Sequence, residues 1–148
     1  MSPKSSRQRW MAILARASAA EMTSLLAHCP ELPDFTVLRG PQSGLVMLRG
    51  RAGGAGGPFN LGEMTVTRCT VRTPGGQFGH AYVAGRDPAQ AELAARLDAA
   101  LQDPARHDAI EAHVVARLEH AQAASREADA ERAAATRVQF FTMATMRS

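Results

Sequence analysis

The chain has 148 residues, and its 17 basic and 14 acidic side chains leave a net charge of +3. This length predicts a single domain, residues 1–148, in which 121–135 form a protruding helical arm and 144–148 a mobile end. No apolar run approaches the roughly 20 residues that cross a bilayer, which excludes a membrane-spanning protein. The hydrophobic residues include 29 alanines, so the core is lean and we expect surface to be buried against partner subunits.

Charge is distributed unevenly along the chain. Residues 36–86 contain six arginines and one acid, whereas residues 87–135 contain ten acids and five arginines. This separation favours an anionic substrate or a partner of complementary charge, because a nucleic-acid-binding protein is more often basic throughout. Cys29 and Cys69 lie far apart, and the N-terminus lacks the apolar core of a signal peptide, so we expect a cytoplasmic protein with reduced thiols.

Helix-start patterns open the chain. Residues 5–8 form a capping-box sequence followed by apolar residues at helical spacing, and residues 18–21 repeat the pattern before a second short apolar face. The second helix has to end before Pro30, because proline disfavours helix in the residue that precedes it. These patterns predict an N-terminal helical hairpin.

The apolar period then changes to that of strands. Strand-like segments begin at Thr36, continue after a Gly40-Pro41 turn at 45–49, and recur at 64–72 and 78–84. Residues 73–76 have the composition of a tight turn, which makes the last two segments the clearest hairpin in the sequence. We predict a small antiparallel β-meander of three to four strands.

The C-terminal third is predominantly helical in pattern. Aspartate-proline pairs at 87–88 and 103–104 predict the start of two C-terminal helices. The second helix leads into 121–135, which favours helix by its alanine content but has no strong core-facing stripe. Residues 136–143 return to β-formers and predict a terminal β-like segment that pairs with the sheet edge or docks on another chain. The predicted fold class is therefore α+β.

A glycine-rich run lies between the two basic strand segments. A phosphate-binding loop needs a following helix, whose first N–H groups hold the phosphates, and this run leads instead into Pro58 and a strand. The remaining interpretations are a flexible connection and a segment that lies closely against another protein's backbone, which glycine permits. The partner-interface candidates are Gly53, Gly54, Gly56, Gly57, Phe59, Phe140 and Phe141.

Basic side chains cluster around this run. Arg68 and Arg72 are four apart on one strand and therefore share a face. A salt bridge to Glu63 or to a helix acid is one interpretation, and contact with a substrate anion is another, because guanidinium groups bind carboxylate and phosphate alike. The candidates for anion or partner contact are Arg49, Arg51, Arg68, Arg72, His80 and Arg86.

His107, His113 and His120, in the second C-terminal helix, predict no metal site, since no H-E-x-x-H sequence is formed and no cysteine accompanies them. His80 lies in a strand beside Tyr82, and an even hairpin register would add Cys69 to the same face. A catalytic base at His80 is one hypothesis for this position. No Ser-His-Asp set can be singled out, and no catalytic residue is assigned.

Three strings carry a family resemblance: RGRAGGAGGPFNLGEMTVTRCTVR at 49–72, GHAYVAGRD at 79–87 and TRVQFFTM at 136–143. With the opening RQRWMAILARA, they make the chain resemble the G subunit of the bacterial carbon-phosphorus lyase system, the PhnG family. The resemblance implies an accessory subunit of a transferase core complex, assembled with H, I and J subunits in two copies each.

In that system MgATP and an alkylphosphonate yield adenine and a ribose 1-phosphonate 5-triphosphate. The I subunit is understood to hold the nucleosidase-like centre, and the G subunit is needed to direct the reaction toward phosphonate rather than water. The resemblance implies no cofactor in this subunit, no nucleic-acid partner and no membrane partner. It supplies no secure active-site residues.

Two other functions stay open on the residues alone. One is a stand-alone basic β module that binds nucleotides, nucleic acid or acidic partners without other subunits. The other is a small independent enzyme built on His80 and Glu63. Co-purification with other subunits separates both from an assembly subunit.

Overall fold

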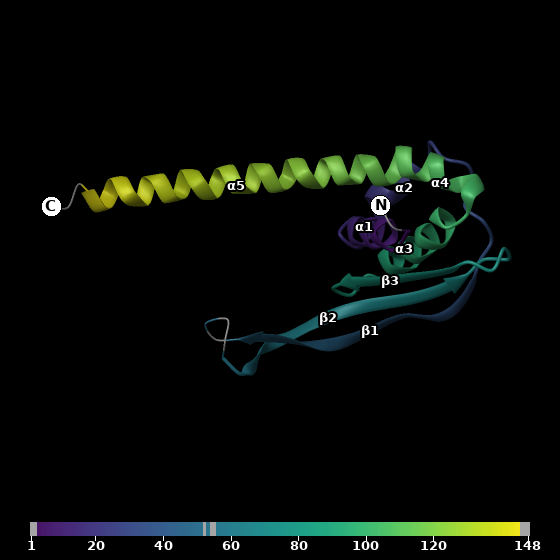
Figure 1. The fold of residues 1–148 in the computed structure, drawn as a ribbon, viewed down its shortest axis with the longest axis horizontal. Helices are drawn as coiled ribbons and strands as arrows, with labels where there is room; N and C mark the ends of the chain where they lie inside the picture. Colours follow the sequence, from purple (N-terminus) through teal and green to yellow (C-terminus); the bar gives the residue numbers. More distant parts are fainter. Residues whose placement is uncertain (1–2, 52, 54–55, 146–148) are drawn as a thin grey trace.

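A computed structural model describes the backbone of residues 3–51, 53 and 56–145, and the side chains of 6–51, 53 and 56–136 (Figure 1). The elements are α1 (Pro3–Ala15), α2 (Ala19–Leu26), β1 (Thr36–Arg51), β2 (Pro58–Arg72), β3 (Phe78–Ala84), α3 (Pro88–Leu101), α4 (Pro104–Ile110), the π-helical turn η2 (Glu111–Val115) and α5 (Ala116–Thr145). The predicted α+β class, the N-terminal helical hairpin and the C-terminal helices are confirmed.

Side-chain caps start three of the helices. Ser18 accepts a hydrogen bond from the Glu21 N–H at 3.1 Å at the start of α2. Asp87 and Asp103 cap α3 and α4 in the same way, accepting from backbone N–H groups at 3.0 Å, and a proline follows each of them. The capping signals in the sequence therefore place these helix starts correctly.

The sheet has three antiparallel strands in the order β1-β2-β3. The predicted turn at Gly40-Pro41 is wrong, because both sides of it pair with β2 and form one strand with register shifts between Val37 and Gln42. Gly40 has φ +73°, and an added Cβ would lie 2.5 Å from the Arg68 carbonyl oxygen. Glycine thus lets the chain bend without leaving the sheet.

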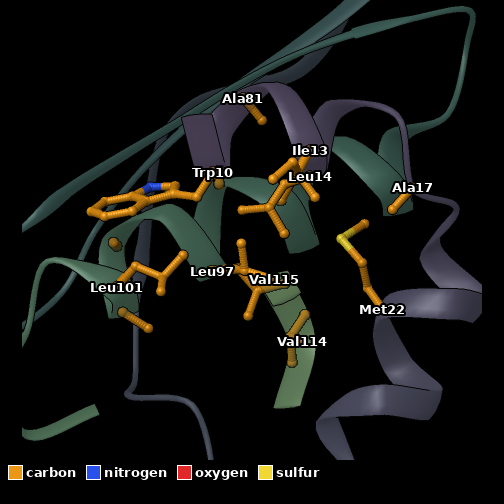
Figure 2. Close-up of a cluster of buried hydrophobic side chains, with 14 of the residues drawn as sticks. Trp10, Ile13, Leu14, Ala17, Met22, Ala81, Leu97, Leu101, Val114 and Val115 are labelled. Carbon is orange, nitrogen blue, oxygen red and sulfur yellow. The ribbon is translucent and has the colours of Figure 1, made fainter. Parts of the chain in front are cut away.

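The helices pack on one face of the sheet and form the core with it (Figure 2). Figure 2 shows Trp10 and Leu14 of α1 meeting Leu97 of α3 and Val115 of η2. Five alanines of α3 are also buried, which lets neighbouring elements approach this helix closely: Ala91, Ala94, Ala95, Ala99 and Ala100. The core is therefore built mainly from small and medium side chains, as the composition predicted.

The outer edge of β3 is closed by side chains. The buried Asp98 carboxylate accepts from the His80 N–H at 2.9 Å, from Trp10 Nε1 at 2.8 Å and from both Arg7 Nε and Nη2. The Phe78 carbonyl accepts from Arg7 and from Gln102 Nε2. Backbone groups of an edge strand that would otherwise need a neighbouring strand are thereby satisfied.

The predicted terminal β-like segment is wrong. The backbone of 136–143 continues α5, which runs to Thr145 as one helix. Helix propagation after an alanine-rich stretch fixes one residue for each hydrogen bond gained, and this outweighs the local β-propensity of Val138 and the phenylalanines. The side chains of Phe140 and Phe141, and the end of the predicted mobile segment, lie outside the described residues.

The helix α5 and the β1–β2 hairpin both project from the body formed by the other helices and β3 (Figure 1). Within the described part of α5, residues 129–136 are all exposed. Among the described residues, no helix combines the length and hydropathy needed to span a membrane.

Candidate binding surfaces of the sheet

The face of the sheet opposite the helices carries a cluster of exposed basic and aromatic side chains. Register places Arg68 opposite Tyr82, Thr70 opposite His80, and Arg72 opposite Phe78, and directly opposed residues share a face. On the other side of β2, Arg39 lies opposite Thr70. We call this set the arginine face: Arg39, Arg68, Arg72, His80 and Tyr82.

Contacts on the arginine face leave its charge available. His80 Nδ1 lies 3.1 Å from the Thr70 hydroxyl, and the Arg72 guanidinium lies 5.5 Å from the centre of the Phe78 ring. Within the described side chains, no ion pair joins Arg68 or Arg72 to an acid, so the predicted salt bridge to Glu63 is absent there. This arrangement can hold an anionic group or the acidic surface of a partner.

The arginines that support the fold behave differently. Arg7 and Arg9 of α1 bind acids of the helical layer, Asp98 for Arg7 and both Glu111 and Glu119 for Arg9. Hydrogen bonds to those acids raise the pKa of both guanidinium groups above its ordinary value. The structure thus separates paired, structural arginines in α1 from the unpaired arginines of the arginine face.

The proposed neighbour of His80 lies elsewhere. Cys69 pairs with Ala81 and points into the core on the helix side, so the register that would join it to His80 does not occur. Burial raises the pKa of the Cys69 thiol, which keeps it protonated and unreactive. Glu63 is seven residues from Thr70 along β2, or roughly 20 Å, so it is out of reach of His80. The geometry does not support an enzyme built on His80 and Glu63.

The remaining basic candidates lie away from the arginine face. Arg49 pairs with Asn60 and Arg51 with Pro58, near the far end of the β1–β2 hairpin. Asn60 is ten residues from Thr70 on β2, about 33 Å along the strand. Arg86 follows β3 at the opposite end from its turn and is exposed. The six predicted contact residues therefore form at least two separate groups.

The glycine run connects the two long strands, as predicted. Gly53 has φ +63°, and Gly57 has open space around its Cα. The strand β2 follows the run directly, so the helix dipole and first N–H groups that a nucleotide loop needs are missing at this place. Of the other interface candidates here, Gly56 and Phe59 are among the described residues, and Phe59 is 45% exposed. Gly54 lies outside the described residues. A partner interface at these glycines stays a prediction.

Sequence reasoning missed Arg39 and Tyr82 as members of the arginine face. Arg39 directly precedes the predicted Gly40-Pro41 turn, and only the pairing with β2 puts it in the sheet opposite Thr70. The spacing of Tyr82 does place it on the face of His80, two residues away in the same strand, but nothing in the sequence marks it as a contact residue.

Comparisons of the sequence with known proteins show the family of this chain. A family model described as "Phosphonate metabolism protein PhnG" matches residues 5–146. The chain belongs to the PhnG family. A PhnG protein of Rhizobium meliloti (strain 1021), "Alpha-D-ribose 1-methylphosphonate 5-triphosphate synthase subunit PhnG", is 46% identical over 140 residues, which are 93% of this chain and 87% of that protein. The family match includes the projecting hairpin and the whole of α5.

Proposed function

We propose that this PhnG chain is an accessory subunit of an alpha-D-ribose 1-methylphosphonate 5-triphosphate synthase, the carbon-phosphorus lyase core complex of phosphonate catabolism. The observation that carries the proposal is the 46% identity to a subunit of that name over 93% of this chain. The proposed partners are the H, I and J subunits, two copies of each, in the cytoplasm. MgATP is a substrate of the complex, and this subunit holds no cofactor of its own.

The site geometry favours a supporting role in catalysis. The described side chains include no cluster of three or more potential metal ligands, and the His80 imidazole has a threonine hydroxyl rather than an acid as its hydrogen-bond partner. The described side chains around His80 include no nucleophile with an adjacent base, the arrangement that covalent catalysis requires. The chain therefore contributes binding and positioning to chemistry that another subunit performs.

The arginine face suggests that the group this chain positions is the anionic phosphonate. In the proposed reaction the bond between adenine and ribose C1 of ATP breaks, a phosphonate oxygen forms a new bond to C1, and adenine leaves with a proton. Methylphosphonate competes with water for C1, so holding the anion near that carbon while excluding water favours transfer over hydrolysis. Arg68 and Arg72 are exposed, unpaired among the described side chains and able to hold such an anion.

Reconstitution tests the function directly. The H, I and J subunits are produced with and without this chain, and adenine release is measured with ATP and methylphosphonate while ³¹P NMR identifies the product. We expect the ribose methylphosphonate triphosphate to form only when this chain is present. Equal product formation without it, or failure of the chain to co-purify with the other subunits, would contradict the proposal.

A second experiment tests the arginine face within the assembled complex. Arg68→Ala and Arg72→Ala are expected to lower the ratio of phosphonate product to hydrolysed ribose triphosphate about tenfold, which is about 1.4 kcal/mol of differential barrier. Arg126→Ala, on the exposed side of α5, serves as the control and is expected to leave the ratio unchanged. An unchanged ratio in both face variants with an intact complex would show that the face does not position the anion.

A further inference from the structure

The β1–β2 hairpin extends well beyond the third strand. β3 pairs with β2 only between Val66 and Arg72, so 58–65 of β2 has β1 as its only neighbour in the sheet. We call 45–51 and 58–65 the ribbon. Figure 1 shows this part of the hairpin reaching beyond the end of β3 and away from α1, α2, α3 and α4. A two-stranded ribbon without a packed face is marginally stable in water by itself.

The ribbon exposes large apolar side chains that would be buried in a complete domain. They are Leu45 (64% exposed), Met47 (55%), Leu48 (42%), Phe59 (45%) and Leu61 (63%). The chain as a whole has 9859 Å² of accessible surface. A compact monomer of 15.8 kDa would have roughly 7,300 Å². Exposed apolar surface concentrated in this way marks an interaction site rather than an ordinary protein surface.

The outer edge of β1 offers backbone pairing as well. β1 is the terminal strand of the sheet, and none of the side-chain hydrogen bonds found at the β3 edge recurs at 45–51 in the described structure. Its proline, Pro41, lies before this segment, so every residue from Leu45 to Arg51 has an N–H group. An open edge of this length accepts an added strand through main-chain hydrogen bonds.

Charge selects the occupant of this edge. Residues 45–51 contain Arg49 and Arg51 and no acid, and Glu63 is the single acid of the ribbon. A second copy of 45–51 would bring four arginines, two from each copy, and no acid onto one short edge, and the net positive charge of such a pair is unfavourable. A strand with apolar side chains on its faces and acidic side chains near Arg49 and Arg51 satisfies both the apolar and the electrostatic requirement.

We propose that the ribbon is the docking site for a β-strand of another synthase subunit, an apolar segment with acidic side chains that pairs with the outer edge of β1. This inference rests on the proposed function, because it requires that the chain works in an assembly. The added strand continues the sheet on the side where β1 is open and places its own apolar side chains beside those of β1.

Binding by substituted chains tests the docking site. The full-length chain is titrated against the co-expressed H, I and J subunits, and the dissociation constant is measured by biolayer interferometry. Leu45→Ser with Leu61→Ser, and separately Arg49→Glu with Arg51→Glu, are each expected to weaken binding at least tenfold. Leu38→Ser is the matched control, since Leu38 is 52% exposed in the same strand but lies before the Gly40-Pro41 bend. Arg126→Glu controls for charge, and both controls are expected to bind within twofold of the unsubstituted chain.

Each outcome separates this inference from the function on which it rests. An unsubstituted chain that fails to bind the other subunits refutes the proposed function. An unsubstituted chain that binds, with ribbon variants that bind equally well, refutes only the docking site. If Leu38→Ser weakens binding equally, the interface is not confined to the ribbon and the proposed docking site is wrong. If the chain forms a stable homodimer that the ribbon substitutions dissociate, the strand that pairs with β1 comes from a second copy of this chain and not from another subunit.

Hydrogen exchange reports on the backbone and is independent of whether the variants fold. In the assembled complex, amide exchange within 45–51 is expected to slow at least tenfold relative to the free chain. Exchange at the arm residues 126–136 serves as an internal reference. Unchanged exchange in 45–51 within an intact complex would overturn the strand-pairing part of the proposal.

Discussion

The two edges of the sheet differ in how their backbone groups are satisfied. At β3 a buried carboxylate, Asp98, and the side chains of Arg7 and Gln102 take the place of a neighbouring strand. At β1 the ribbon segment has an open edge and exposed apolar side chains on the same strand. The difference indicates that side chains of this protein satisfy backbone groups at the β3 edge, whereas the β1 edge is left open for a partner.

The largest expected effect concerns the closed edge. Asp98→Ala leaves the Trp10 indole N–H, the His80 N–H and the Arg7 guanidinium without their acceptor. Arg7 can turn to water, but each of the two N–H groups left unsatisfied in the interior costs about 1–3 kcal/mol, so the total loss should be about 2–6 kcal/mol. Urea denaturation followed by circular dichroism should show this loss in the free energy of unfolding. Asp129→Ala, which removes an exposed ion pair with Arg132, should change it by less than about 0.5 kcal/mol. Similar losses in both variants would contradict a special role for the closed edge.

A second comparison uses the two parts of α5. Leu118 is buried against the core, and Leu118→Ala should cost about 2–5 kcal/mol. Ending the chain after Ser125 removes an arm whose residues 129–136 are all exposed and keeps the Gln122 hydrogen bond to the Ile13 carbonyl, so it should cost less than about 1 kcal/mol. Thermal melting of the isolated chains measures both. An arm truncation as damaging as Leu118→Ala would show that the arm belongs to the folded body.

Two glycines compare the closely packed strand β3 with the open strand β1. A Cβ at Gly79 would lie 1.9 Å from the Ala95 carbonyl oxygen, so Gly79→Ala forces β3 and α3 apart and should cost about 1–3 kcal/mol. A Cβ at Gly44 meets nothing within 4 Å, and Gly44→Ala should stabilise the strand by up to about 1 kcal/mol. Denaturant midpoints of the two variants would then move in opposite directions.

The smallest expected effect is a pH dependence at the start of α4. The Ala105 N–H and the Arg106 guanidinium hold the pKa of Asp103 below its ordinary value. The lowered pKa means that this contribution to stability is present above the pKa of the unfolded chain and is lost as pH falls through the folded value. Melting temperatures from about pH 6 to about pH 2 should therefore fall less steeply for Asp103→Asn than for the unsubstituted chain. Parallel profiles would contradict this assignment.

Local signals in the sequence were sufficient for much of the fold. The caps at Ser18, Asp87 and Asp103 and the turn before β3 act within a few residues, so they can be recognised without tertiary information. The continuation of β1 through Gly40 and Pro41 depends on pairing with β2, which local propensity does not contain. The helix at 136–143 likewise depends on the helix that precedes it.

The candidate surfaces were predictable only in part. Period-2 spacing placed Arg68 with Arg72 and His80 with Tyr82, and the sheet register then joined these two pairs. The same register put Cys69 on the buried face and removed it from the site. The separation of Arg49 and Arg51 from this group arises because β1 and β2 are long, a length that the sequence analysis underestimated for both strands.

The π-helical turn η2 sets the phase of the long C-terminal helix. A turn of this type contains one residue more than an α-helical turn, and here the consecutive residues Val114 and Val115 are both fully buried. Leu118 is buried on the same side as Ile110, although the extra residue of η2 rotates the helix between them. Loss of a single residue from η2 would rotate everything downstream by about 100°. The five residues of η2, which directly precede α5, thus determine which side chains of α5 point in which direction.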